Sequence, residues 1–238
     1  MKIEVFEENT CGADFVCSDI HGHFSLLERQ LEAVKFNKSV DRLFCLGDLI
    51  DRGDESHRVI HYLSQPWFHS ILGNHELMLI DAFESESEHV RRQWGYWGGD
   101  WADDLDEDQL QQYYDVLVTL PMAIELAVSS TQVVGLVHAE LPMICDWRDV
   151  KRELENKPSA DNLTNTALLH GMMWNKNQMR SAEAIRGVLP AVENIDHVFH
   201  GHTILNEITT VSNRTFLDLG SYETGVIGLI SPLDYIEG

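Results

Sequence analysis

The chain has 238 residues, of which 44% are hydrophobic and 24% charged, and its formal net charge is -22 at pH 7. This composition is typical of a globular protein with one sizeable core, and no linker rich in Pro, Gly or Ser divides the chain, so we expect one domain over residues 1–238. The strong negative charge disfavours nonspecific binding to nucleic acid or to an anionic membrane surface.

The N-terminal residues and the cysteines indicate the cellular compartment of the protein. The first ten residues carry Glu4, Glu7 and Glu8 and lack the basic-then-apolar order of a signal peptide. No apolar run approaches the ~20 residues that span a bilayer. Cys17 and Cys45 fall in expected buried strands, where an inert core thiol is favoured. The sequence therefore predicts a cytoplasmic protein.

The first part of the chain alternates short apolar runs with amphipathic segments. Helices are expected over 24–35, over 55–64 and from residue 77 onwards, since apolar residues recur there at helical spacing. Strands are expected over 13–18, 41–48 and 69–72. This alternation predicts a parallel sheet with crossover helices. Each strand ends on a polar cluster, and open α/β sheets gather their ligands at that edge.

The segment 81–115 is acidic and aromatic, and we expect a small helical insertion that lies over the sheet. Its acidic run, 100–108, matches no calcium-loop spacing and is interpreted as a solvated face. Its tryptophans, Trp94, Trp97 and Trp101, are expected to pack rather than to form a ligand platform.

The rest of the chain is richer in strands. Residues 122–128 and 131–137 are expected to form an antiparallel pair, followed by an irregular stretch after Pro142 and a helix over 164–174. Further strands are expected over 197–199, 207–211, 215–219 and 226–231, with a turn at 213–214. This half adds a second sheet, so the predicted fold class is α/β, with two packed sheets flanked by helices.

The polar residues at the strand ends share one chemistry. They offer nitrogen and oxygen ligands and no thiolate, which suits divalent metals such as Mn, Fe, Zn or Co. A carboxylate such as that of Asp48 can bridge two cations, and two metals ~3.5 to 4 Å apart are the usual device for in-line displacement at phosphorus. One ion would be held by Asp19, His21 and Asp48, and the other by Asp48, Asn74, His138 and His202.

Three residues next to the candidate ligands are expected to support the site without binding metal. Glu76 is expected to cap or orient the start of a helix. His23 and His200 each adjoin a candidate ligand, and both are interpreted as supports that contact the ligands from behind.

Five blocks, DIHGH (19–23), GDLIDRG (47–53), GNHE (73–76), VHAE (137–140) and HGHT (200–203), occur in this order. Together they resemble the signatures of the phosphoprotein phosphatase family of metallophosphoesterases, in the branch of the bacteriophage lambda protein phosphatase and its bacterial relatives. Pro66-Trp67-Phe68 and Trp174-Asn175 extend the likeness, which covers nearly the whole chain. The resemblance implies the metallophosphoesterase β-sandwich, two sheets flanked by α-helices.

Residue by residue, the resemblance implies the six metal ligands named above, with Mn²⁺ expected and Fe and Zn as the other candidates. It also implies His75 as general acid, Asp51 as the carboxylate that orients it, Arg52 as phosphate clamp and Asn74 as a substrate contact. Histidine is well suited to protonate an alkoxide leaving group near pH 7.

One departure concerns the segment after Trp174-Asn175, where the family has a second phosphate-clamping arginine and this chain has Lys176. Lysine is a point charge that cannot form the bidentate fork, so Lys176 is expected to bind phosphate more weakly or in another orientation. Arg180 is a substitute candidate.

The resemblance implies a metal-dependent phosphatase for phosphoserine and phosphothreonine in phosphoproteins or phosphopeptides, with phosphotyrosine as a second substrate class. A metal-bridging hydroxide would attack phosphorus directly, without a covalent phosphoenzyme. A dinucleoside polyphosphate hydrolase is the first alternative, because such enzymes share the metal blocks. A non-catalytic interaction module is the second, and the intact Asn74, His75, Asp51 and Arg52 disfavour it. The native metal, the physiological substrate and the oligomeric state stay open.

Overall fold

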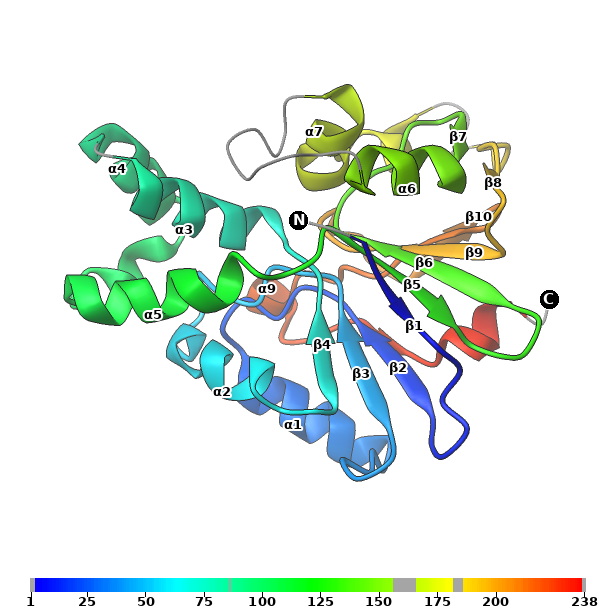
Figure 1. Cartoon of the computed structure of the whole chain (residues 1–238), viewed down its shortest axis with the longest axis horizontal. Helices are drawn as coiled ribbons and strands as arrows, with labels where there is room; N and C mark the ends of the chain where they lie inside the picture. Colours follow the sequence, from blue (N-terminus) through cyan, green and yellow to red (C-terminus); the bar gives the residue numbers. More distant parts are fainter. Residues whose placement is uncertain (1–2, 86, 156–165, 182–185, 237–238) are drawn as a thin grey trace.

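The computed structural model describes residues 3–85, 87–155, 166–181 and 186–236. Two main sheets pack against each other, with α1 and α2 on the outer side of one and α6 and α7 on the outer side of the other (Figure 1). These are the two packed sheets flanked by helices that the sequence predicts. No helix in the described part of the chain is long and apolar enough to cross a bilayer.

The first sheet has four strands in the order β12-β2-β3-β4. The parallel strands β2 (Asp14–Cys17), β3 (Arg42–Cys45) and β4 (Phe68–Ser70) alternate with α1 (Phe24–Ala33), the short helix η1 (Ser56–Arg58) and α2 (Val59–Leu63), as predicted. The strand β12 (Leu229–Ile230) pairs antiparallel with β2.

The second sheet has six strands in the order β1-β5-β6-β9-β11-β10. The predicted antiparallel pair forms β5 (Ala123–Ala127) and β6 (Val133–Val137). The further strands are β9 (His197–His200), β10 (Thr209–Val211) and β11 (Arg214–Phe216). The strand β1 (Ile3–Phe6), which the sequence analysis missed, joins this sheet parallel to β5. A separate two-stranded ladder consists of β7 (Cys145–Asp146) and β8 (Val192–Glu193).

The core has two parts. One lies between the sheets and includes Phe44 and Leu46 from the first sheet side and Leu136 and Phe199 from the second, all fully buried. The other fills the space under the helices. Cys17 and Cys45 are both buried in this second part, as the sequence predicts.

Two expectations for the second half were wrong. The stretch expected to be irregular contains α6 (Trp147–Glu155), which buries Trp147, Val150 and Leu154 on one face and precedes α7 (Ala167–Trp174). Part of the expected helix 164–174 lies outside the described residues. Arg214 is not in a turn: it belongs to β11 and is fully buried, and its guanidinium donates to the carbonyl oxygens of Leu141 and Pro142.

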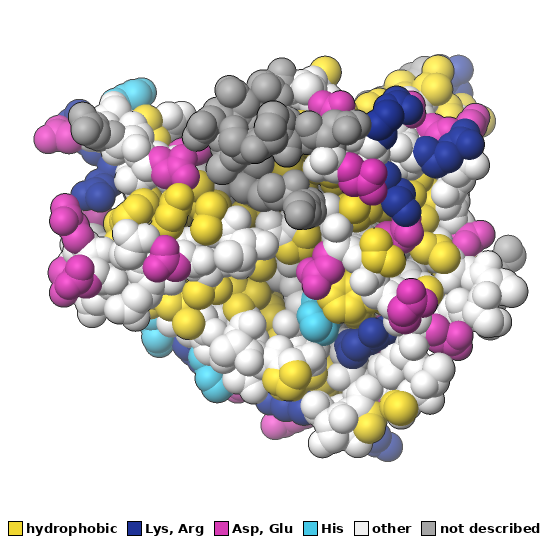
Figure 2. Space-filling view, viewed as in Figure 1, with side chains coloured by type: hydrophobic (Ala, Val, Ile, Leu, Met, Phe, Trp, Pro, Cys, Tyr) yellow, Lys and Arg dark blue, Asp and Glu magenta, His cyan; other side chains and the backbone are white. Residues whose placement is uncertain are grey.

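The helical insertion is present. It comprises the C-terminal part of α3 (Asn74–Glu84), α4 (Glu88–Tyr96), the short helix η2 (Gly99–Ala102) and α5 (Glu107–Leu117). These helices project to one side of the sheets and do not lie over them as expected (Figure 1). The Asp and Glu residues of its 100–108 run are exposed, and acidic side chains mark the outer edge of the insertion (Figure 2). The acidic run is therefore a solvated face, as predicted. Three further short helices follow: η4 (Gln178–Arg180), α9 (Ser221–Thr224) and η5 (Pro232–Tyr235).

Candidate metal centre and active site

The polar ends of the strands meet at one cavity of about 480 Å³. Eight of the ten candidate site residues line it directly, and the other two, His138 and Asp51, lie behind lining residues. The lining includes Asp19, His21, Asp48, Arg52, Asn74, His75, Lys176 and His202. His138 is fully buried behind Asn74, with its Nε2 2.9 Å from the Asn74 Oδ1.

Asp48 lies at the centre of this arrangement. Its Oδ2 is 3.6 Å from the His21 Nε2 and its Oδ1 is 3.4 Å from the His138 Nε2. Potential ligand atoms of Asp48, His138 and His202 all lie within 4.8 Å of one another, and so do those of Asp48, His21 and His75. The carboxylate of Asp48 is therefore shared between two groups of ligand atoms, which is the geometry that a bridging ligand requires.

The backbone is bent sharply where it presents these side chains. His21, Asp48 and His202 have φ values of 46°, 51° and 62°, in the left-handed region that residues other than glycine rarely adopt. Each such residue costs on the order of 1–3 kcal/mol, and such conformations cluster at functional sites. A Cβ at Gly47 would come 2.6 Å from the Gly73 N, so only glycine lets these two loops approach.

Glu76 fixes the loop that carries Asp48. It is fully buried, and its carboxylate accepts hydrogen bonds from the backbone N–H groups of Gly73, Asp48 and Leu49 at 2.9, 2.8 and 2.7 Å. The predicted role at the start of a helix is confirmed, because Gly73 is the N-cap of α3. The same side chain also holds two ligand-bearing loops together.

The imidazoles are oriented from behind. The Nδ1 of His138 lies 2.7 Å from the carbonyl oxygen of Leu46, and that of His21 lies 3.1 Å from the carbonyl oxygen of Ile50. An Nδ1–H that donates to these carbonyls leaves a lone pair on Nε2, facing the cavity. The His23 Nδ1, in turn, lies 2.6 Å from the His21 carbonyl oxygen, which confirms a contact behind a candidate ligand.

His200, the other neighbour considered, does not line the cavity. Its Nδ1 lies 2.6 Å from the Ala139 carbonyl oxygen, and its ring stacks on Phe216.

The electrostatics of the centre fit divalent cations. Burial, and next the charge of Asp19, raise the pKa values of both Asp48 and Asp218. Burial also lowers the pKa of His138, and that of His202 to about 2, so both imidazoles are neutral near pH 7. Buried carboxylates next to neutral imidazoles form a ligand set that a divalent ion would stabilise.

Asp19 differs from the other candidates. Both of its carboxylate oxygens lie 3.1 Å from the His202 backbone N, and its Oδ1 accepts a hydrogen bond from the Ser18 hydroxyl at 2.6 Å. It lines the cavity but belongs to neither close group of ligand atoms.

A second polar group lies beside the metal centre. The His75 Nδ1 is 2.7 Å from the Asp51 Oδ2, and the His75 Nε2 is 3.1 Å from the Arg52 Nη2. Burial raises the pKa of Asp51 to about 7, and burial and the Arg52 charge lower that of His75. Although His75 lies near His21 and Asp48, its Nε2 faces a guanidinium. The Arg52 Nη2 can only donate, so in this arrangement the His75 Nε2 accepts from it and carries no proton.

Two residues expected to bind phosphate, Arg52 and Lys176, line the cavity. Lys176 is exposed, whereas Arg180 does not line the cavity. The guanidinium of Arg52 lies 4.2 Å from the ring centroid of Tyr222, a cation–π contact.

The cavity has further lining residues that the sequence analysis missed, among them Asp218, Tyr222, Gln93 and Trp97. Asp218 follows a strand end, as the predicted ligands do, and that position was an available signal. The tryptophans do more than pack: Trp97 lines the cavity, and the indole N–H groups of Trp94 and Trp101 donate to Asp51.

Known proteins are similar to this chain in sequence and in fold. The calcineurin-like phosphoesterase family matches residues 15–205. Serine/threonine-protein phosphatase 2 of Escherichia coli (strain K12) is 31% identical over 214 residues, 89% of this chain and 88% of that protein. The symmetrical bis(5'-nucleosyl)-tetraphosphatase of Pseudomonas putida (strain W619) is 41% identical over 76 residues, 31% of this chain and 26% of that protein.

Among solved structures, a putative diadenosine tetraphosphatase has a TM-score of 0.58 at 20% identity and covers 95% of this chain and 92% of its own. At that identity the likeness concerns the fold alone. The family match covers most of the chain and the cavity residues up to Ile204. Two lining residues, Asp218 and Tyr222, lie beyond it. This chain therefore belongs to the calcineurin-like phosphoesterases.

Proposed function

We propose that this protein is a metal-dependent phosphatase for phosphoserine and phosphothreonine in proteins, acting in the cytoplasm with Mn²⁺. The observation that carries the proposal is the His75–Asp51 pair, which lies beside Arg52 on the wall of the ligand-rich cavity. An alkoxide is a poor leaving group, so its departure calls for a proton donor of this kind.

Two divalent metal ions complete the proposed site. One ion would be held by Asp19, His21 and Asp48 and the other by Asp48, Asn74, His138 and His202. Two divalent ions supply Lewis-acid stabilisation of the phosphoryl oxygens and a nucleophile at neutral pH.

The chain's own residues supply the remaining steps. Arg52 donates two N–H groups to the nonbridging phosphate oxygens, and Lys176 adds a positive charge at the mouth. A bound phosphate offsets the Arg52 charge and so favours the protonated form of His75. As the bond between phosphorus and the serine oxygen breaks, the proton on the His75 Nε2 passes to that oxygen.

The comparisons favour a protein substrate. Similarity to the bacterial serine/threonine phosphatase extends over 89% of this chain. Similarity to the Pseudomonas putida tetraphosphatase is confined to 31% of it. A nucleotide leaving group is also a weaker base than an alkoxide and needs less help from an acid.

The variant His75→Asn tests the proposed acid. Turnover of a phosphoserine peptide is expected to fall roughly 10²- to 10⁴-fold, because the proton donor is lost. Turnover of 2,4-dinitrophenyl phosphate, whose leaving group needs no proton, is expected to fall far less. The exposed His57 gives a matched control, His57→Asn, with both rates kept.

Equal losses on the two substrates would contradict the role of His75. Diadenosine tetraphosphate, assayed beside the phosphopeptide with the unaltered protein, tests the substrate class. A large preference for the nucleotide would replace the proposed function by the tetraphosphatase.

A further inference from the structure

We propose that Trp94 and Trp101, in the helical insertion, are positioning residues that fix the Asp51 carboxylate and thereby aim His75 at the leaving oxygen. This inference rests on the proposed function in one respect, which is the role of His75 as proton donor. The insertion would thus be a working part of the active site rather than a cover over it.

The contacts converge on one carboxylate. The Asp51 Oδ2 accepts a hydrogen bond from the Trp94 Nε1 at 2.9 Å and lies 2.7 Å from the His75 Nδ1. The Asp51 Oδ1 accepts from the Trp101 Nε1 at 2.7 Å. An indole N–H can only donate, so both tryptophans favour an ionised carboxylate. With both oxygens held, Asp51 cannot turn away from His75.

The insertion also holds the backbone next to this carboxylate. The Arg52 N donates to the Gly98 carbonyl oxygen at 3.0 Å. Asp51 and Arg52 have φ values of 71° and 69°, two consecutive left-handed residues that need support from outside their own loop. Trp94, Gly98 and Trp101 give that support from within eight residues of sequence.

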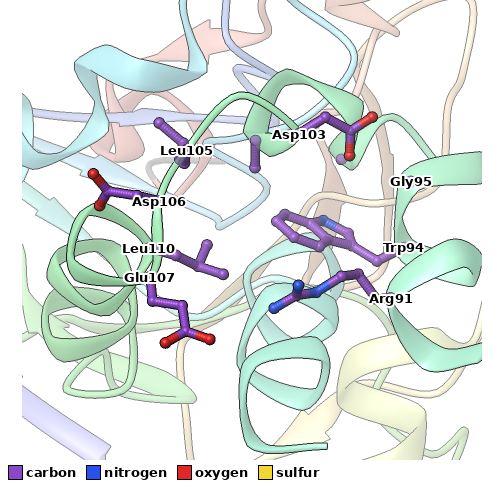
Figure 3. Close-up of a pocket in the computed structure, with 10 residues that line it drawn as sticks. Arg91, Trp94, Gly95, Asp103, Leu105, Asp106, Glu107 and Leu110 are labelled. Carbon is purple, nitrogen blue, oxygen red and sulfur yellow. The ribbon is translucent and has the colours of Figure 1, made fainter. Parts of the chain in front are cut away.

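Packing alone does not account for Trp94. One side of its ring borders a second cavity, about 110 Å³ in volume, between α4 and α5, where it faces Leu110 (Figure 3). The ring is therefore not enclosed on every side. A buried indole N–H needs an acceptor, and these two indoles, from different elements, find theirs on the same fully buried carboxylate.

The variants Trp101→Phe and Trp94→Phe test the inference, because each removes one N–H donor and keeps an aromatic ring. For each, kcat is measured on the phosphoserine peptide and on 2,4-dinitrophenyl phosphate. Loss of a partner behind a functional group typically costs 10- to 100-fold, so we expect the peptide rate to fall about tenfold. The aryl phosphate rate is expected to change much less.

Trp147→Phe is the matched control. Trp147 is buried and its indole N–H also donates to a carboxylate, that of Glu125 at 2.7 Å, but it does not line the cavity. Loss of the same kind of bond there is expected to leave the ratio of the two rates unchanged.

A double-mutant cycle separates positioning from folding. In an Asp51→Ala background, which has no side-chain acceptor, Trp101→Phe is expected to have no further effect on the peptide rate. Equal losses on both substrates, or a full additional loss in the Asp51→Ala background, would overturn the inference. The His75→Asn result keeps the two proposals apart: if His75→Asn discriminates between the substrates and the tryptophan variants do not, only this inference fails.

Discussion

The strand-end loops and the helical insertion contribute to the same cavity in different ways. The strand ends present ligand atoms around Asp48 from short blocks, each of which sits directly after a strand. The insertion lines the cavity with Gln93 and Trp97, and through Trp94, Gly98 and Trp101 it holds the loop that carries Asp51 and Arg52. The candidate ligands thus follow directly from the strands that position them. The contacts that hold Asp51 and Arg52 in place come from a segment more than 40 residues away.

The largest effect is expected at the strand ends. Asp48→Asn keeps a residue type that tolerates the left-handed backbone but removes the shared charge. Losing several kcal/mol of metal-based stabilisation corresponds to roughly a 10³-fold fall in turnover. Turnover and bound Mn²⁺ are measured together, with the exposed Glu193→Gln as control. If Asp48→Asn keeps full metal content and activity, Asp48 does not bridge two metal ions, and the strand ends do not have the larger effect.

An intermediate effect is expected in the insertion, where Gly98 can be compared with Gly95. Gly98 has φ 109°, and a Cβ there would come 2.7 Å from the Arg52 N. Gly98→Ala is therefore expected to lower the free energy of unfolding by ~1–3 kcal/mol and to impair turnover. Thermal unfolding and kcat are the measurements.

Gly95, one helical turn earlier, is the control for that variant. A Cβ at Gly95 meets nothing within 4 Å, and the residue lies inside α4. Gly95→Ala is expected to raise stability by roughly 0.5–1 kcal/mol with turnover kept. If both variants behave alike, the insertion does not hold Arg52 in the way described.

The smallest effect is expected at Lys176. Because an arginine fork binds phosphate oxygens in pairs, Lys176→Arg is expected to lower KM for the phosphopeptide a few-fold. Arg180→Lys, on a residue that does not line the cavity, is the control and should leave KM unchanged. An unchanged or higher KM for Lys176→Arg would mean that this side chain does not contact the phosphate.

Much of the fold and of the cavity could be predicted from the sequence. The first sheet and its helices follow from apolar periodicity, and Asp48, Asn74 and His202 lie where the strand ends placed them. These signals are local, because each polar block is adjacent to the strand that positions it. The one-domain organisation and the roles of the individual site residues stay predictions.

The rest depends on contacts between distant segments. Trp94 and Trp101 lie 43 and 50 residues from Asp51, and nothing in their spacing shows where their N–H groups point. The helix α6 was missed because only three apolar residues mark its buried face among charged neighbours. The strand β1 is short and lies at a sheet edge, so its pattern is weak.

The exchange of strands between the sheets has a consequence for folding. The first strand, β1, belongs to the six-stranded sheet, and the last, β12, belongs to the four-stranded sheet that the early part of the chain builds. Each half of the polypeptide thus supplies a strand to the sheet of the other half, and neither sheet is complete until both halves are present. Such long-range pairings delay folding relative to local ones, so assembly of the sandwich is expected to be slow and cooperative.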